Sequence, residues 1–485
     1  MTLRFHNQLT KQIDDLKPIR DRRVSLYTCG PTVYDYPHVG NWSSYIYWDT
    51  LVRVLQAYDL KVDRVMNITD VGHLVSDADD GEDKLEKGAR REGKTAWEVA
   101  AFYTEDFIKG MNLLGLIEPT HITKATDYIE EQLALVKTLK EKGFTYQIDD
   151  GIYFDTAKFP TYDDFAELHL DAQKAGARVE YNPEKRNNSD FALWKFTPAG
   201  ENRDMQWETP ADIIEGEVRM GFPGWHLECS AMAMSLLGNT LDIHTGGIDH
   251  IPVHHTNEIA QSEAATGERF SNIWIHNNHI KINGTKISKS LGNSVTLQDI
   301  QEKGYDPLDF RLFVLQGHYS NEGNFTDENL EAAKNRRLNW RSIAALRHQT
   351  HDTLRSNEDQ STDEKTVSLY ASSQALKEAL ADNLDTPAAF AIIDDAFGQI
   401  LNAKIDDIHQ HALTSFIETI DELLGLKLLE TSPDVSDDVK RLIIERERAR
   451  DNKDFNEADK LRAKIEKSGI TVRDTAGGSI WEYSA

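Results

Sequence analysis

Short β-rich runs alternate with a helical periodicity in the first 70 residues of the chain. "VSLYTCG" (24–30) ends at a Gly-Pro break, and "VDRVMNI" (62–68) is a second run of the same kind. Between them Tyr47, Leu51 and Leu55 recur at every fourth position, which predicts a helix. Strand, helix and strand in this order predict a βαβ unit with parallel strands. The dinucleotide fingerprint GxGxxG is absent from the first turn, which disfavours an NAD enzyme.

A long middle block follows this unit. Residues 95–145 are helical in pattern, while residues 151–159 and 190–196 are strand-like. We therefore expect an insertion at roughly 95–215. Its last part, residues 201–220, has no role that the sequence indicates.

The α/β pattern returns with two further β-rich runs, "LDIHTGG" (241–247) and "NIWIHN" (272–277). After about residue 306 the pattern becomes helical. A charged helical pair then precedes the short module "GITVRDTAGGSIWEY". The sequence thus predicts an α/β domain with a parallel sheet, a helical domain and a small terminal module, over residues 1–305, 306–430 and 431–485.

Composition agrees with a multidomain globular chain. The length of 485 residues suggests about three domains, and 39% hydrophobic residues suffice for ordinary cores. No apolar run is long enough to span a membrane, and the start lacks the apolar core of a secretion signal. Only two cysteines occur, which fits a reducing cytoplasm without a disulfide framework.

The net charge of -27 argues against broad, non-specific binding to a polyanion. The charge is uneven, however. Residues 440–485 carry 11 Lys/Arg against 9 Asp/Glu, a local net of +2. A local basic face is sufficient for a specific nucleic-acid contact, so the sequence leaves such a partner open.

The two cysteines stand in notable surroundings. Cys29 ends the first predicted strand, and Cys229 lies in "GFPGWHLECSAMAM". Downstream, His254 and Glu258 are four positions apart and would share one face of a helix. All four residue types are zinc ligands, and four ligands complete a tetrahedral site. The residue types alone are equally compatible with two buried thiols and a surface His–Glu pair.

Two short motifs are candidates for phosphate binding. "HVGN" (38–41) falls where the first strand passes into a helix, whose N-terminus suits an anion. "NGTKISKSLGNS" (283–294) places Lys286 and Lys289 in a Gly/Ser-rich loop. Two ammonium groups there can neutralise a triphosphate. Alternatively, the first motif is a turn before an N-cap and the second is a basic surface loop.

Together these motifs resemble those of class I aminoacyl-tRNA synthetases, and specifically those of the cysteinyl-tRNA synthetase family. Family-like text covers almost the whole chain in the family's order: "YTCGPTVYDYPHVGN", "MNITDVGHL", "KATDYIEEQ", "DFALWK", "GWHLECSAM", "LDIHTGGIDH", "HHTNEIAQSEA", "KISKSLGNS", "LFVLQGHY", "NLDTPAA" and "KDFNEADKLRAKI".

The resemblance implies a role for each candidate residue. The implied zinc ligands, for one ion per chain, are Cys29, Cys229, His254 and Glu258. The implied ATP-binding residues are His38, Gly40, Asn41, Lys286 and Lys289, all but the glycine being catalytic. The residues implied around the bound cysteine or adenylate are Thr69, Trp225 and Asp249. The histidines expected to crowd the same pocket are His226, His244 and His255.

The same resemblance implies a Rossmann-like catalytic domain, with a terminal module that reads the anticodon of tRNA(Cys). We expect Trp481 of this module to stack on a base. The expected enzyme is a cytoplasmic, monomeric cysteine–tRNA ligase that uses L-cysteine, ATP and Mg²⁺. Two positions depart from the family pattern: Asn41 stands for the usual His, and Ile287 for the usual Met. An Asn amide can donate to phosphate but carries no charge, so the rate of activation is left open.

Two rival functions remain. A related ligase that joins cysteine to an amino sugar would share the zinc and ATP motifs. It would not need the last ~180 residues, a span larger than a typical domain. A non-catalytic, zinc-stabilised RNA-binding protein would explain the tail and the ligands, but it would leave HVGN and KISKS without a role.

Overall fold

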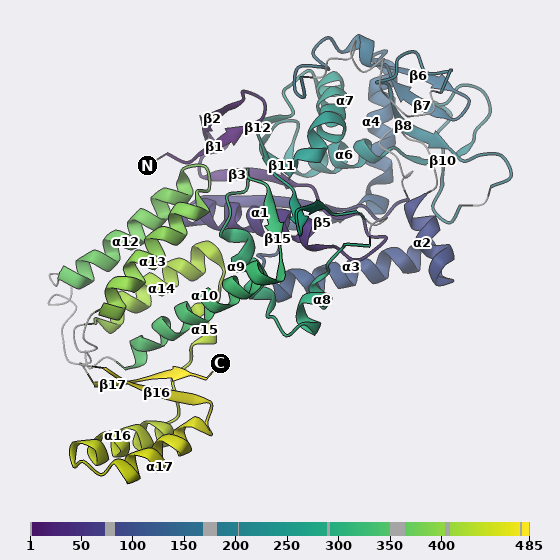
Figure 1. Cartoon of the computed structure of the whole chain (residues 1–485). Helices are drawn as coiled ribbons and strands as arrows, with labels where there is room; N and C mark the ends of the chain where they lie inside the picture. The colour runs from purple at the N-terminus through teal and green to yellow at the C-terminus, as the bar shows by residue number, and fades with distance from the viewer. Residues whose placement is uncertain are drawn as a thin grey trace. The chain divides into compact units, whose positions relative to one another are not determined.

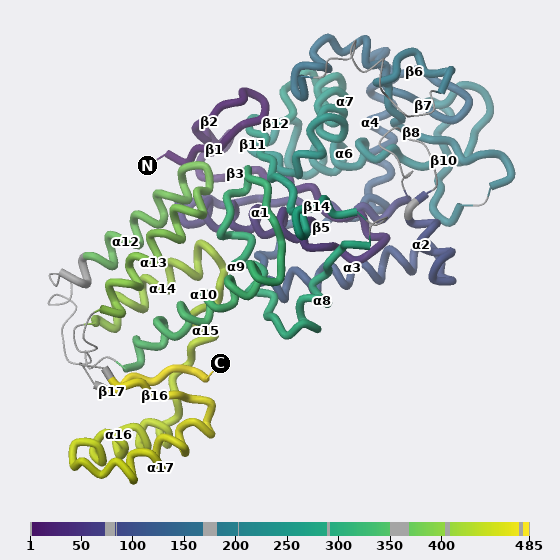
Figure 2. Tube along the Cα trace, in the orientation of Figure 1, coloured from purple at the N-terminus to yellow at the C-terminus, as the bar shows by residue number. Residues whose placement is uncertain are grey.

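The computed structural model describes residues 2–72, 83–167, 182–201, 203–288, 292–349, 364–402, 408–475 and 478–484 (Figures 1 and 2). The chain forms two compact units. The first comprises residues 2–299 and 319–324, and the second comprises residues 300–318 and 325–485 together with residue 1. Within the described ranges, no helix combines the length and the apolar character needed to cross a membrane.

A five-stranded parallel sheet forms the centre of the first unit. The strand order is β12-β11-β3-β4-β5, and every neighbouring pair is parallel. The strands are β3 (Arg23–Thr28), β4 (Lys61–Ile68), β5 (His121–Lys124), β11 (Leu241–Gly247) and β12 (Ser271–Asn277). Almost every residue of β11 is buried, as is typical of a sheet with both faces covered. The predicted α/β fold with a parallel sheet is confirmed.

Strand β5 corrects one prediction. It lies within residues 95–145, which the sequence pattern predicted as helical. The segment instead consists of α3 (Ala96–Leu113), the edge strand β5 and α4 (Ile129–Glu141). Four residues between two long helices are too short to show a period of two, so the pattern missed the strand.

Helix α1 (Val39–Ala57) connects β3 to β4 and buries the predicted positions Tyr47, Leu51 and Leu55. Helix α3 packs against it. The rings of Trp42 and Phe107 stack with centroids 5.1 Å apart. This packing fixes the N-terminal turn of α1, which carries the HVGN motif.

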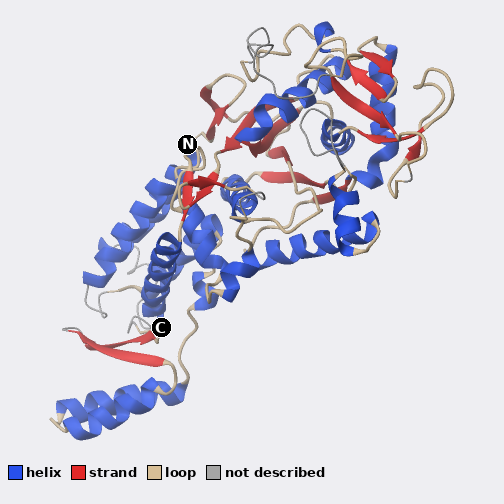
Figure 3. Ribbon diagram, turned by 45° about the vertical axis from the view of Figure 1, so that its right-hand side comes forward, coloured by secondary structure: helices blue, strands red, loops and turns tan. Residues whose placement is uncertain are grey.

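A second sheet is antiparallel and has the order β6-β7-β8-β10-β9. Its strands are among those drawn as red arrows in Figure 3. Its strands are β6 (Thr145–Ile148), β7 (Gly151–Phe154), β8 (Phe191–Phe196), β9 (Trp207–Glu208) and β10 (Met220–Pro223). One core joins this sheet to α4, α6 (Trp225–Leu237) and α7 (Thr256–Thr266) through Phe191, Leu227 and Ala260, among others. The sheet therefore supports the two helices that carry Cys229 and Glu258.

Residues 203–204 have a structural role within the segment 201–220, for which the sequence indicated none. Arg203 pairs with Asp83, the N-cap of α2 (Lys84–Glu92), and its guanidinium carbon lies 3.7 Å from the centroid of the Phe222 ring. The backbone N–H of Asp204 donates to Glu86, and its carboxylate accepts from Ala96 at the start of α3. The segment thus holds the junction of α2 and α3.

Smaller elements complete the first unit. They are the hairpin of β1 (Arg4–Asn7) and β2 (Gln12–Asp15), and the strands β13 (Ile280–Ile282), β14 (Thr285–Lys286) and β15 (Gly323–Phe325). Helix α8 (Leu297–Glu302) contains the position at which the chain passes from the first unit to the second.

The second unit is mainly helical, as the sequence predicted. Its helices are α9 (Pro307–Leu315), α10 (Asp327–Ala345), α12 (Glu364–Ala381), α13 (Thr386–Asn402), α14 (Gln410–Leu424), α15 (Leu428–Thr431), α16 (Asp437–Asp451) and α17 (Phe455–Glu466). It ends in the antiparallel hairpin of β16 (Ile470–Thr475) and β17 (Gly478–Tyr483). Val439, Ile443, Ile465 and Trp481 belong to a core shared by this hairpin with α16 and α17.

Candidate active site

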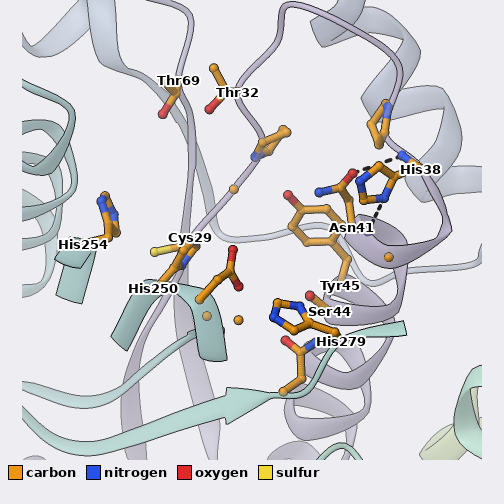
Figure 4. Close-up of a pocket in the computed structure, with 18 of the residues that line it drawn as sticks. Cys29, Thr32, His38, Asn41, Ser44, Tyr45, Thr69, His250, His254 and His279 are labelled. Atoms are coloured by element: carbon orange, nitrogen blue, oxygen red, sulfur yellow. Dashed lines mark hydrogen bonds between the residues drawn. The ribbon is translucent and has the colours of Figure 1, made fainter. Parts of the chain in front are cut away.

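A cavity of about 410 Å³ opens beside the carboxyl ends of β3 and β11 (Figure 4). In open α/β sheets this edge is the usual place for a ligand, because the loops that follow the strands can diverge there. Ten of the twelve residues proposed from the sequence line the cavity: Cys29, His38, Gly40, Asn41, Thr69, Trp225, Cys229, Asp249, His254 and Lys286. Glu258 does not line the cavity. Lys289 lies outside the described residues.

Four candidate metal ligands meet at one end of the cavity. Cys29 follows β3, Cys229 lies in α6, His254 lies in a π-helical turn (Ile251–His255), and Glu258 lies in the first turn of α7. One donor atom of each lies within 4.8 Å of the others, and all four residues are buried. Single π-turns inside helices are frequent at functional sites. Cys29 and His254 are about 225 positions apart in the sequence, and the parallel sheet brings them together.

A second set of donors shares two of these residues. Cys29, His244, His255 and Glu258 also lie within 4.8 Å of one another. The two histidines of this second set, His244 and His255, contact other side chains of the cluster. His244 Nε2 lies 2.8 Å from Glu258 Oε2, His255 Nδ1 lies 2.7 Å from His276 Nε2, and His255 Nε2 lies 3.4 Å from Cys29 Sγ. By position, the second set is therefore as compatible with a metal ion as the first.

The electrostatics of the cluster favour a cation. Burial would raise the pKa of Glu258, but the facing rings of His244 and His254 lower it to about 2. Burial would lower the pKa of His254, but Glu258 and Cys229 raise it to about 10. Burial also raises the pKa of Cys29. The anionic donors therefore hold a proton on His254, and a divalent cation in the cluster would replace it.

The contact between Glu258 and His254 agrees with this interpretation. Glu258 Oε1 is buried and lies 2.8 Å from His254 Nε2, the nitrogen that carries the proton facing it. A divalent cation bound between the two side chains would take the place of that proton. The cluster of two thiols, an imidazole and a carboxylate is thus compatible with a metal site.

The other end of the cavity is the N-terminus of α1. His38 and Asn41 form a reciprocal cap: the His38 N–H donates to Asn41 Oδ1 at 3.0 Å, and the Asn41 N–H donates to His38 Nδ1 at 3.2 Å (Figure 4). Because Nδ1 accepts, the neutral His38 ring carries its proton on Nε2. Because Oδ1 accepts, Asn41 keeps its NH₂ group for a ligand. Asn41 can therefore cap the start of α1 and still offer a hydrogen-bond donor, although its side chain carries no positive charge.

Lys286 stands at the end of β14 and lines the cavity, and its side chain is exposed. Gly40, in the first turn of α1, also lines the cavity. An added Cβ there would come 3.0 Å from the His38 ring and 3.1 Å from Ile287, the residue that follows Lys286. The helix N-terminus, the His38 and Asn41 donors and a lysine are together compatible with an anion site.

The expected histidine pocket needs correction. His226, His244 and His255 are all buried, but none of them lines the cavity. His226 Nδ1 lies 3.0 Å from His254 Nδ1, so it contacts a candidate ligand from behind. The histidines that do line the cavity are His38, His250, His254 and His279. Sequence proximity to the ligands could not tell which rings face inward.

Several lining residues were missed by the sequence analysis. Ser44 follows Gly40, and Tyr45 follows Asn41, by four positions in α1, a helical spacing that could have identified them. Asn277 ends β12, Asn278 and His279 follow it, and all three line the cavity. They end a β-rich run of the parallel sheet, which is the position where polar residues of α/β proteins commonly contact ligands.

Gly30 admits no side chain, and we expect Gly30→Ala to disrupt the site. An added Cβ would lie 1.7 Å from the backbone oxygen of Asn67. Backbone cannot give way cheaply, so overpacking should lower the free energy of unfolding by about 1–3 kcal/mol. The shift falls next to Cys29, so bound metal should decrease as well. Urea denaturation and metal analysis would measure both.

Gly398→Ala in α13 is the matched control. A Cβ there meets no atom within 4 Å, so the helix should be unchanged or stabilised by about 0.5–1 kcal/mol. If Gly30→Ala and Gly398→Ala had the same free energy of unfolding and the same metal content, the close approach at Gly30 would be contradicted.

Comparison with known proteins agrees with this geometry. Residues 15–335 match the model of the class I (C) tRNA synthetase catalytic domain, and residues 432–481 match the cysteinyl-tRNA ligase anticodon binding domain. A cysteine–tRNA ligase of Treponema denticola is 39% identical, with 99% of this chain and 100% of that protein covered. Cysteine–tRNA ligase 1 of Burkholderia lata is 40% identical, with 99% and 96% covered.

Solved structures share the fold. A methionyl-tRNA synthetase of Mycobacterium tuberculosis with methionyl-adenylate gives a TM-score of 0.55 at 15% identity, over 84% of this chain and 91% of that one. A LeuRS–tRNA–LeuAMS complex from Agrobacterium radiobacter gives a TM-score of 0.59 at 12% identity, over 87% and 86%. By its sequence, the chain belongs to the cysteine–tRNA ligase family of class I aminoacyl-tRNA synthetases.

Proposed function

We propose that the chain activates L-cysteine with ATP and transfers the cysteinyl group to the 3′ end of tRNA(Cys). One observation carries this proposal. A single cavity has thiol-binding chemistry at one end, with Cys29, Cys229 and His254, and an anion site at the other, with His38 and Asn41. An enzyme that forms cysteinyl-adenylate must hold a thiol and a triphosphate side by side.

The reaction has two steps. A carboxylate oxygen of cysteine attacks the α-phosphorus of ATP, the bond to the bridging oxygen breaks, and pyrophosphate leaves. A terminal hydroxyl of the tRNA then attacks the activated carbonyl, and AMP leaves. Both steps depend mainly on positioning and on stabilisation of charge.

The residues of the anion site fit this task. His38 Nε2 and the Asn41 NH₂ group are positioned to donate to phosphate oxygens, and the dipole of α1 adds positive potential. Lys286 and Lys289 neutralise charge that moves onto the leaving pyrophosphate, with Mg²⁺ bound to the phosphates. The cap between His38 and Asn41 orients both donors before ATP arrives.

We propose zinc as the metal, held by Cys29, Cys229, His254 and Glu258. Two thiolates and an imidazole in a cluster of four ligands favour this ion over Mg²⁺ or Ca²⁺. When bound, zinc supplies a Lewis acid that prefers a thiolate to a neutral hydroxyl. The Trp225 ring, whose centroid lies 4.4 Å from that of His254, lines the cavity beside the cluster.

We further propose a division of labour along the chain. Residues 1–305, with an insertion at roughly 95–215, carry out activation. Residues 306–430 form a helical stem, and residues 431–485 read the anticodon. We expect a cytoplasmic monomer, on the family resemblance alone.

The aromatic contact to the anticodon needs a different residue from the one the sequence suggested. Trp481 is only 4% exposed and belongs to the core of the terminal module, so it cannot stack on a base. Phe455, at the first turn of α17, is 62% exposed and is the most exposed large hydrophobic side chain in the described part of the chain. Exposed side chains of Arg441, Lys460 and Arg462 stand on α16 and α17.

Phe455→Ala should therefore weaken charging of tRNA(Cys) and spare adenylate formation. Loss of one stacking contact costs ~1–3 kcal/mol, or about 5- to 150-fold in kcat/KM for tRNA. Tyr370→Ala is the control, because Tyr370 is 42% exposed on α12, outside the module. Charging that is equally affected by both changes, or by neither, would remove Phe455 from the tRNA contact.

Two assays test the proposed function. Cysteine-dependent exchange of pyrophosphate into ATP tests activation, and charging of a tRNA pool with each amino acid tests transfer. Exchange with cysteine and acylation of tRNA(Cys) alone are the expected results. Exchange without acylation would favour the amino-sugar ligase, and neither reaction would favour the RNA-binding protein.

A further inference from the structure

Three buried polar side chains form a hydrogen-bonded chain along one wall of the cavity. The Gly30 N–H donates to Asn67 Oδ1 at 2.7 Å. Asn67 Nδ2 donates to Thr69 Oγ1 at 3.0 Å, and Thr69 Oγ1 donates to Glu228 Oε2 at 3.0 Å. Asn67 is 2%, Thr69 1% and Glu228 0% exposed. Glu228 adjoins the candidate ligand Cys229, yet the mechanism above does not use it.

The direction of this chain is fixed by chemistry. A backbone N–H can only donate, so the amide of Asn67 must turn its oxygen to Gly30 and its NH₂ group to Thr69. A carboxylate can only accept, so the proton of the Thr69 hydroxyl must point to Glu228. Each group in this chain therefore fixes whether the next group donates or accepts the hydrogen bond between them.

The Thr69 hydroxyl is left with a single function toward the cavity. Its oxygen has two lone pairs, and Asn67 fills one of them. Its proton is committed to Glu228, and the described residues offer it no other hydrogen bond. Thr69 lines the cavity together with Cys29, and both face it in Figure 4. The hydroxyl can therefore accept a hydrogen bond from a ligand but cannot donate one.

An acceptor of this kind selects a donor group. The α-ammonium of an amino acid has three N–H donors and no acceptor. A thiol without an amine offers nothing to the second lone pair. A hydroxyl free to rotate could instead serve either type of ligand, so the restriction depends on the Glu228 carboxylate.

We propose that Glu228 is a positioning residue that makes the Thr69 hydroxyl a pure acceptor, so that the cavity selects a thiol ligand carrying an ammonium group. This inference rests on the proposed function, since it names how cysteine is distinguished from other thiols. Glu228 acts through Thr69 and does not itself line the cavity.

The test compares two ligands that differ only in the ammonium group. Dissociation constants of L-cysteine and 3-mercaptopropionate are measured by calorimetry on the metal-loaded full chain. Thr69→Val should weaken cysteine binding by about 10- to 100-fold, the size of a hydrogen bond to a charged group, and leave 3-mercaptopropionate within about 3-fold. Thr69→Ser retains the hydroxyl and should retain the preference for cysteine.

Glu228→Met removes the acceptor at similar volume, and it should reduce the same preference at least about 5-fold. Glu228→Gln restores an acceptor oxygen and should recover most of the loss. Because the two residues act in series, Thr69→Val with Glu228→Met should lose no more preference than Thr69→Val alone.

Equal weakening of both ligands by Glu228→Met, or an unchanged preference, would overturn the proposal. If Glu228→Met fails to fold or to bind metal, an unchanged preference in Thr69→Val still overturns it. The proposed function fails separately, by the absence of cysteine-dependent pyrophosphate exchange in the unaltered chain.

Discussion

Serine should be activated at least ~10⁴-fold less efficiently than cysteine, although the two amino acids differ in one atom. Apolar contacts cannot give this factor, because a pocket that fits a thiol also admits the smaller hydroxyl. A site built on a specific polar interaction can, since the wrong ligand leaves it unsatisfied. In the proposed mechanism that interaction is with a metal ion held by Cys29, Cys229, His254 and Glu258.

Changing the cluster should change the selectivity. Cys229→Ser should lower both the zinc content and the affinity for cysteine, because it replaces a thiolate ligand by a weak one. The ratio of kcat/KM for the two amino acids in pyrophosphate exchange is the relevant measurement. A metal-free protein that still preferred cysteine by ~10⁴ would make the zinc purely structural.

Lys286→Ala should slow cysteine activation by about 10²- to 10³-fold, the usual cost of losing one positioned charge at a reacting group. Lys286 lines the cavity and is exposed, so its removal should leave the free energy of unfolding almost unchanged. The sequence motif predicts the same for Lys289→Ala. Single-turnover formation of adenylate would measure the effect on the chemical step.

Lys281→Ala is the control for this prediction. Lys281 lies on the neighbouring strand β13 and pairs with Glu322 at 2.7 Å, but it does not line the cavity. A surface pair of this kind contributes about 0–1 kcal/mol to stability and nothing to activation. Normal pyrophosphate exchange in Lys286→Ala would remove this lysine from the reaction.

The sequence predicted those elements of the fold in which hydrophobic residues recur at a regular spacing over many residues. Tyr47, Leu51 and Leu55 mark one face of α1 over more than two turns, and the structure buries all three. The four residues of β5 do not suffice for such a signal. Trp481 was misjudged for another reason: an aromatic residue in a small module serves its core as readily as a ligand, and only packing decides.

The candidate site was predictable as a set of residue types, and less so as a geometry. The sequence motifs identified Cys29 and Cys229 as candidate ligands. They could not reveal the π-turn that places His254 beside Glu258. Nor could they reveal the hydrogen bonds among Asn67, Thr69 and Glu228. The contact of Thr69 with Glu228 joins residues 159 positions apart and exists only because the sheet and α6 bring them together.

X-ray absorption at the zinc edge tests the central claim most directly. The account predicts one zinc per chain with two sulfur ligands, from Cys29 and Cys229, and one further sulfur ligand when L-cysteine is added. Serine should leave the sulfur count at two. A count that stays at two in saturating cysteine would contradict the selection of the substrate thiol by the metal.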